Sequence, residues 1–201
     1  MFKKFSRSED VASSTAVKSS IQRGIRSKLV EQMPLLSQAS PSHAATTATD
    51  GDAETITLLD TLWPKKEGLT LVKCRDHISI FALHGTPLFF QHFEGPYFPT
   101  LRLLHQYPDL LPKVQVDKGA IKFVLAGANI MCPGLTSPGG YLTSSLAPET
   151  AVAIFAESKH LPCAVGLMKM STEEIRKVNK GIGVDNVQFL GDELWLNGKE
   201  L

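Results

Sequence analysis

The chain of 201 residues has few cysteines and no long apolar run. Its three cysteines, Cys74, Cys132 and Cys163, are far apart and in no paired spacing, which disfavours both a disulfide framework and a zinc site. Only His160 stands at a metal-binding spacing from a cysteine, and two ligands are too few for structural zinc. No stretch approaches the roughly 18 to 20 apolar residues that cross a bilayer. We therefore expect no metal, no other cofactor and no membrane span.

Signals for export and for common catalytic machinery are also missing. Met1 to Phe5 contains two lysines but neither the apolar stretch nor the small-residue cleavage site of a secretory signal. There is no GxSxG, no cluster of Asp and Glu, and no His beside a plausible partner, so an enzyme would lack its nucleophile and base. No GxxxxGKS or GxxxxGKT loop is present, and Gly181-Ile182-Gly183 lacks the third glycine of a dinucleotide fingerprint. These absences favour a cytosolic, non-enzymatic protein.

The net charge of +1 hides an uneven distribution along the chain. Residues 1–36 carry seven basic and three acidic groups, a net charge of +4. Residues 37–54 carry only the acidic groups Asp50, Asp52 and Glu54. Any surface that faces phosphates is therefore a patch of the molecule and not the whole of it.

A helix is predicted over Ser13–Met33, because Val17, Ile21, Ile25, Leu29 and Met33 recur at every fourth position. Ser13 or Ser14 is in place to cap it. The basic residues between the apolar ones face either solvent or RNA, and the sequence does not decide which. Residues 37–55 are almost entirely Ser, Ala, Thr, Pro, Asp and Gln, too polar to offset the entropy of ordering, so we expect a disordered insert.

Strand-like runs at 69–74, 78–83 and 88–93, separated by turn residues, predict an antiparallel meander. Prolines then flank a short helix around Leu101–Tyr107 and suggest a domain boundary near Pro112 to Gln115. Beyond it, short apolar runs, a helix at Thr172–Asn179 and closing strands at Asn186–Leu190 and Glu193–Leu196 predict a small mixed barrel.

The segment from Val116 to Leu135 is rich in glycine and lysine. Gly119, Gly127 and Gly134 permit tight turns and let a ligand approach the backbone. Lys118 and Lys122 would share one face of a helix begun at Asp117 and so meet a phosphate chain, and the free amides of that helix start would add an anion site. Ordinary surface turns have the same composition, so these residues alone leave both interpretations open.

The same segment resembles the PUA domain, an RNA-binding module named after pseudouridine synthases and archaeosine transglycosylases. The valine-acidic-x-Gly-Ala start of that domain is present as Val116–Ala120, and its Gly-Ala-x-x-x-x-Pro-Gly loop as Gly127–Gly134. Further stretches make the chain similar to the malignant T-cell amplified sequence family of translation factors over nearly its whole length except the insert. These stretches are Met1–Phe5, Glu94–Pro96, Pro99–His105, Gln115–Ser137 and Met168–Gly181.

The resemblance implies an α+β fold in two domains. Residues 1–114 would form an N-terminal α/β pre-PUA domain with an antiparallel sheet, interrupted by the insert at 37–55, and residues 115–201 a C-terminal PUA pseudo-barrel. The implied function is noncanonical initiation, reinitiation and ribosome recycling on the small ribosomal subunit, in a heterodimer with density-regulated protein. The PUA domain would handle tRNA, without catalysis and without a role for DNA or membrane.

Carried onto this sequence, the resemblance assigns two sets of RNA-binding residues. The tRNA acceptor end would contact Lys118, Gly119, Ala120, Lys122, Asn129, Met131, Cys132, Pro133 and Gly134. Ribosomal RNA would contact Lys3, Lys4, Lys18, Arg26, Lys65 and Lys66. Two alternatives stay open: an adaptor for free structured RNA, and a protein-interaction module alone that docks through the aromatic residues of the meander, Phe81, Phe89, Phe90, Phe93, Tyr97 and Phe98. The insert departs from the family, which has a short connection there, and we expect a surface loop.

Overall fold

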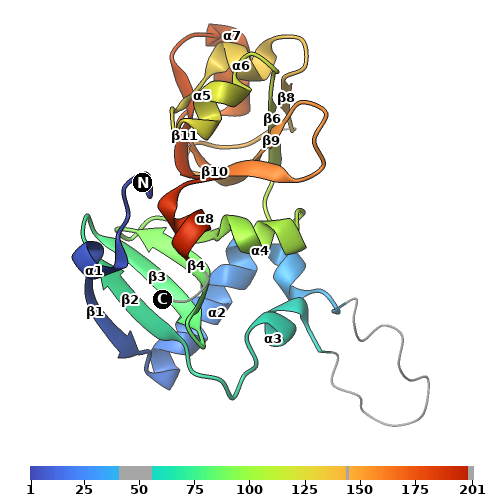
Figure 1. Ribbon diagram of the computed structural model, residues 1–201. Helices are drawn as coiled ribbons and strands as arrows, with labels where there is room; N and C mark the ends of the chain where they lie inside the picture. The colour runs from blue at the N-terminus through green and yellow to red at the C-terminus, as the bar shows by residue number, and fades with distance from the viewer. Residues whose placement is uncertain (41–55, 144, 199–201) are drawn as a thin grey trace, which may run out of the picture.

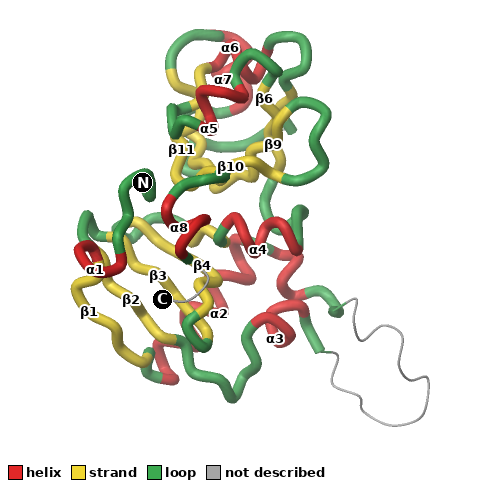
Figure 2. Tube along the Cα trace, in the orientation of Figure 1, coloured by secondary structure: helices red, strands yellow, loops and turns green. Residues whose placement is uncertain are grey.

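The computed structural model describes residues 1–40, 56–143 and 145–198. They form two parts, each built on its own sheet (Figure 1). The first sheet has the strand order β1-β2-β3-β4-β5 and the second β7-β11-β10-β9-β6-β8. Helices α5, α6 and α7 lie at the end of the second part that is remote from the first sheet (Figure 2). The fold is α+β with an antiparallel N-terminal sheet, as predicted.

Two tight hairpin turns shape the first sheet, in which all neighbouring strands are antiparallel. Asp76 and His77, between β2 and β3, have φ angles of 55° and 56°, and His84 and Gly85, between β3 and β4, have 50° and 81°. Two-residue hairpins need such left-handed pairs, because their twist then matches that of the strands. The predicted meander is confirmed. The strands are β1 (Val11–Ala16), β2 (Thr70–Cys74), β3 (Ile78–Leu83), β4 (Thr86–His92) and β5 (Tyr97–Pro99).

The helix predicted from Ser13 begins later than expected. Residues Val11–Ala16 pair with β2 as an edge strand, and the helix α2 starts at Ser19 after Lys18, so Ser13 and Ser14 do not cap it. Four of the five predicted apolar positions are buried, but Ile21 is 55% exposed. The apolar residues at every fourth position therefore predicted the wrong start of the helix, because Val11–Ala16 pair with β2 as a strand. The helices of this part are α1 (Arg7–Asp10), α2 (Ser19–Gln32), η1 (Pro34–Ser37), α3 (Leu58–Leu62) and α4 (Leu101–Gln106).

The predicted insert is folded at its beginning. Ser37 closes η1, Ala39 forms a β-bridge with Thr57, and the backbone N–H of buried Ser40 donates to Ile56 O at 3.0 Å. Residues 37–40 therefore do not belong to a disordered segment, since these backbone contacts hold them beside α3. Residues 41–55 of that prediction lie outside the described part of the chain.

The second sheet is mixed, because β6 runs parallel to β9 while all other neighbours are antiparallel. The helix predicted at Thr172–Asn179 is confirmed as α7: Ser171 caps it through a capping box with Glu174, and Asn179 ends it at φ 47°. The predicted closing strand at Glu193–Leu196 was wrong: Asp192 Oδ1 accepts from Trp195 N at 2.8 Å and starts a helix instead. The elements are β6 (Lys113–Val116), α5 (Ile121–Leu125), β7 (Ile130–Met131), α6 (Cys132–Thr136), β8 (Tyr141–Leu142), β9 (Ala151–Ala156), β10 (Pro162–Met168), α7 (Thr172–Val178), β11 (Ile182–Phe189) and α8 (Glu193–Asn197).

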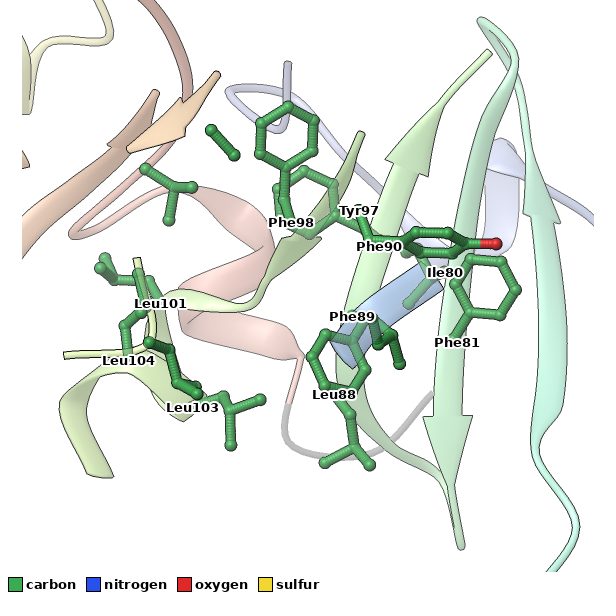
Figure 3. Close-up of a cluster of buried hydrophobic side chains, with 14 of the residues drawn as sticks. Ile80, Phe81, Leu88, Phe89, Phe90, Tyr97, Phe98, Leu101, Leu103 and Leu104 are labelled. Carbon is green, nitrogen blue, oxygen red and sulfur yellow. The ribbon is translucent and has the colours of Figure 1, made fainter. Parts of the chain in front are cut away.

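The two parts share a continuous apolar core. Figure 3 shows the aromatic centre of this core, where Phe90 stacks on Phe98 with ring centroids 5.2 Å apart. Phe155, Val187 and Leu194 from the second part belong to the same buried cluster. Of the six aromatic residues considered for protein docking, only Phe93 is exposed, and the other five are buried. This burial weighs against a docking surface built from the aromatic residues of the meander.

No helix within the described ranges combines the length and the apolar character needed to span a bilayer.

Candidate RNA-binding site

A cavity of about 670 Å³ opens at the remote end of the second part, between α5, β7 and α6. Its walls are unusually apolar for an exposed surface, because Phe123, Met131 and Ile182 are 55%, 51% and 42% exposed. We call this cavity the PUA groove. It is lined by Asp117, Gly119, Ala120, Phe123, Val124, Ala128, Asn129, Ile130, Met131, Pro133, Gly134 and Ile182.

One wall of the PUA groove is a turn and not the start of a helix. Asp117 Oδ1 accepts from Ala120 N at 2.8 Å, and α5 begins only at Ile121. The expected anion site at a helix start beginning at Asp117 was therefore wrong, since the Asp117 carboxylate already engages the amide of Ala120. The backbone N–H of Lys118 is likewise engaged, by Glu157 Oε2 at 2.8 Å.

The base of the PUA groove is a close contact between the turn at Asp117–Ala120 and the helix α6. Asp117 N donates to Gly134 O at 2.9 Å. A Cβ on Gly134 would lie 3.1 Å from the Cβ of Ala120, which is tighter than ordinary van der Waals contact. Glycine at this position therefore lets the two backbone segments approach each other, whereas the sequence predicted that it would admit a ligand.

Buried Asn186 fixes the loop that follows α5. Its Nδ2 donates to Val124 O at 3.0 Å and to Ala128 O at 3.1 Å, while its backbone N–H donates to Asn129 Oδ1 at 3.0 Å. Gly127 turns the chain between them at φ 81°. The loop is thus held to β11, so the groove is formed before any ligand arrives.

Positive charge adjoins the apolar wall. Lys118 and Lys122 are both exposed, and Lys122 Nζ lies 4.9 Å from the centroid of the Phe123 ring. An aromatic face with a cation beside it suits a nucleic-acid base and its phosphate.

The structure brings together most of the residues predicted for the acceptor end. Gly119, Ala120, Asn129, Met131, Pro133 and Gly134 line the PUA groove. Lys118 and Lys122 adjoin it, while Cys132 is fully buried with its Sγ 3.4 Å from Lys180 O, and burial raises the pKa of its thiol. Cys132 therefore cannot touch a ligand in this conformation, contrary to the prediction.

Six residues that line the groove were not among the predicted contacts: Asp117, Phe123, Val124, Ala128, Ile130 and Ile182. Phe123 and Ile182 are the large exposed apolar side chains of this set. For Phe123 a signal existed: Ile121 and Val124, three apart, face inward, so helical periodicity turns Phe123 outward. Ile182 carries no such signal, because only the pairing of β11 with β7 places it beside Met131.

Five of the six basic residues predicted for ribosomal RNA line one of two surface depressions, Lys3 and Lys4 the first and Arg26, Lys65 and Lys66 the second. Arg7 and Arg23, which were not predicted, line them too. The N-terminal basic patch consists of Lys3, Lys4 and Arg7, around a depression of about 900 Å³. The α2 basic patch consists of Arg23, Lys65 and Lys66, around a depression of about 620 Å³. Lys18 is exposed just before α2 and lines neither depression.

The guanidinium of Arg26 is engaged by other residues of the protein. Its Nη2 lies 2.5 Å from Asp60 Oδ1, its Nη1 donates to Trp63 O at 2.6 Å, and its guanidinium lies 4.8 Å from the centroid of the Trp63 ring. These contacts hold α2 against α3. Arg26 lines the depression of the α2 basic patch, but its charge is already paired with that of Asp60.

Thiol and metal chemistry find little support in the described residues. All three cysteines are free and buried, and burial raises the pKa of Cys74 and of Cys163 to about 11. Thiols with such pKa values stay protonated and unreactive at neutral pH. Within residues 1–40, 56–143 and 145–198, no three His, Cys, Asp or Glu side chains gather closely enough to hold a metal.

Known protein domains share the fold of both parts of the chain. Residues 5–108 match the Pre-PUA-like domain and residues 112–190 the PUA domain. A conserved PUA domain protein from Thermoplasma acidophilum, 21% identical, superposes with a TM-score of 0.57 over 92% of this chain and 98% of that chain. That likeness supports the fold alone.

Closer relatives cover almost the whole chain. Translation machinery-associated protein 20 of Schizosaccharomyces pombe is 47% identical over 195 residues, which are 97% of either chain. Malignant T-cell-amplified sequence 1-A of Xenopus laevis and malignant T-cell-amplified sequence 2 of Homo sapiens are each 48% identical over the same share. With a Pre-PUA-like domain followed by a PUA domain and this degree of identity, the chain belongs to the malignant T-cell-amplified sequence family.

Proposed function

We propose that this protein is a cytoplasmic, non-enzymatic translation factor that binds the small ribosomal subunit together with density-regulated protein. In this proposal residues 115–201 hold the acceptor end of tRNA, and residues 1–114 face the ribosome and the partner. The complex serves noncanonical initiation, reinitiation and ribosome recycling by positioning tRNA, or by helping deacylated tRNA to leave.

The observation that carries the proposal is the preformed PUA groove with exposed Phe123 beside two lysines. Specific RNA recognition usually targets unpaired ends, whose bases are free to stack on aromatic side chains. The unpaired end of an acceptor stem fits this pattern: a base stacks on Phe123, and Lys118 and Lys122 neutralise the phosphates. The name of the Schizosaccharomyces pombe relative, a translation machinery-associated protein, supports the same assignment.

The two basic patches support the ribosomal part of the proposal. Lys3 and Lys4 of the N-terminal basic patch, and Lys65 and Lys66 of the α2 basic patch, lie on the first part of the molecule, away from the PUA groove. Contacts with phosphates at several positions would anchor the protein on ribosomal RNA while the groove stays open for tRNA.

The test is tRNA binding by two matched variants, Phe123→Ala and Leu125→Ala. Both side chains are exposed on α5, at 55% and 40%, but only Phe123 lines the PUA groove. Base stacking is worth about 1 to 3 kcal/mol, so Phe123→Ala is expected to weaken binding of deacylated tRNA roughly 5- to 150-fold. Leu125→Ala is expected to bind as the unsubstituted protein does.

The RNA substrate separates this proposal from binding to any structured RNA. An acceptor-stem hairpin with an unpaired 3′ end is expected to compete with tRNA, and the same hairpin with a blunt end is not. Equal competition by both hairpins, or equal affinity of Phe123→Ala and Leu125→Ala, would remove the groove from the proposal.

A further inference from the structure

The strand β1 forms an open edge of the first sheet (Figure 1). It spans Val11–Ala16, and every residue from Ala12 to Ala16 is exposed. Its side chains are Ala, Ser and Thr after the initial valine, so no charge and no proline interrupts the exposed segment. Natural proteins usually protect an edge strand with lysine, proline or a short length.

The other sheet edges of the described chain are protected. The strand β5 has three residues, all buried, and ends on Pro99. At the edges of the second sheet, β7 and β8 have two residues each. β1, with six residues, is thus the long and unprotected edge among these four, apart from a register shift between Val11 and Ser13.

The pairing of β1 with β2 determines which backbone groups are open. Val17 N donates to Leu69 O at 2.8 Å, so the N–H of Val17 points toward the next strand of the sheet. In an antiparallel ladder the direction alternates from residue to residue. The backbone N–H and C=O groups of Ser13 and Thr15 therefore also point toward β2. Those of Ser14 and Ala16 point away from the sheet.

Such a row of outward groups is complementary to one kind of ligand, an extended polypeptide backbone. A second copy of β1 is a poor occupant, because it would bury only small side chains and fall well below the roughly 800 Å² per partner of a stable interface. A segment of a different protein that makes further contacts elsewhere does not have this limit. The exposed charges around β1 are Arg7, Lys18, Lys73 and Arg75 against Glu9 and Asp76, with Asp10 half-buried. Basic groups outnumber acidic ones, which favours an acidic segment.

We propose that β1 accepts an extended, acidic segment of the partner protein, which adds to the first sheet as a further strand. The inference rests on the proposed function for its partner, density-regulated protein. Backbone pairing along Ser14 and Ala16 supplies affinity, and exposed Ile21, just beyond the strand on α2, offers an apolar contact for its end.

Amide hydrogen exchange of the full chain, resolved by residue, tests the inference. In the free protein the amides of Ser13 and Thr15 are expected to exchange slowly and those of Ser14 and Ala16 fast. Addition of density-regulated protein from the same organism is expected to slow Ser14 and Ala16 roughly tenfold or more, because the added strand closes them.

The affinity of two matched variants for density-regulated protein tests the strand addition independently. Ser14→Pro removes an outward N–H at a place where an edge strand tolerates proline, and should weaken partner binding roughly tenfold. Ser14→Thr keeps the N–H and should bind as the unsubstituted protein does. Unchanged tRNA binding by Ser14→Pro shows that the variant is folded.

A heterodimer in which Ser14 and Ala16 exchange as fast as in the free protein would overturn the strand addition and leave the proposed function intact. Full partner binding by Ser14→Pro would do the same. If no heterodimer forms at all, both this inference and the partner of the proposed function are overturned, whereas tRNA binding in the PUA groove is measured separately.

Discussion

Replacing both lysines beside the PUA groove should change how tRNA binding responds to salt. Lys118 and Lys122 are exposed and adjoin the groove, and Lys122 Nζ lies 4.9 Å from the centroid of the Phe123 ring. The variant Lys118→Ala with Lys122→Ala removes both charges without touching the buried contacts of Ala120 and Gly134 that form the groove base. Its fold should therefore be unchanged.

The expected size follows from counterion release. Each phosphate contact with a single strand contributes about 0.7 to the slope of log affinity against log salt, so two contacts contribute about 1.4. Over a fourfold rise in salt, the unsubstituted protein should lose about sevenfold more affinity than the variant. At low salt the variant should bind more weakly, and at high salt the two proteins should converge.

Fluorescence anisotropy with labelled deacylated tRNA across a salt series measures this slope. Lys159→Ala is the control, because Lys159 is exposed but does not line the PUA groove. Equal slopes for the unsubstituted protein and the double variant would refute the placement of phosphates at these lysines. Equal affinity at low salt would refute it as well.

Two further predictions concern stability. Arg26→Met should lower the free energy of unfolding by about 2 kcal/mol, because it removes the contacts with Asp60 and Trp63. The control Lys28→Met, on the same helix, should change the free energy of unfolding by less than about 0.5 kcal/mol. Chemical denaturation measures both values, and equal losses of stability would contradict the structural role of Arg26. Burial raises the pKa of Asp192 to about 6, above its unfolded value of 3.8, so the folded state binds more protons between these pH values. The contribution of Asp192 to stability is then present below about pH 4 and lost as the pH rises through about 6. Asp192→Asn should flatten this fall in unfolding free energies measured from pH 4 to 7, and an unchanged pH profile would contradict the shift.

Local sequence signals predicted the first sheet well because they act over a few residues. The turns at Asp76-His77 and His84-Gly85 separate the apolar runs, and each adopts the left-handed pair that a two-residue hairpin needs. The cap at Ser171 likewise decides the start of α7 locally. Such features depend on neighbours in sequence, so the sequence is sufficient to predict them.

The errors share a different cause, contacts between residues far apart in the sequence. The fourfold apolar repeat extended the helix to Ser13, but pairing with β2, some sixty residues later, makes Val11–Ala16 a strand. The surroundings of Arg26 were likewise not predictable from nearby residues, because Asp60 and Trp63, 34 and 37 positions later, contact its guanidinium. Its contact with ribosomal RNA stays a prediction.

The candidate site shows the same division. The glycine motifs located the PUA groove, because the motif residues lie within one short segment. Ile182 lines the groove only because β11 pairs with β7. The side chain of Cys132 does not reach the groove, because it is buried and its Sγ contacts Met170 Sδ and Lys180 O. Motif matching thus finds the loop, and tertiary structure decides which of its side chains face the ligand.

The most direct test of the proposed function is sedimentation of the purified protein with small ribosomal subunits, with and without density-regulated protein, across a salt series. The protein is expected to co-sediment, more strongly with the partner and less strongly as salt rises, because phosphate contacts of the two basic patches weaken with counterion concentration. Absence of co-sedimentation at every salt concentration, with the partner present, would contradict the translation-factor function and leave a PUA protein that acts on free RNA.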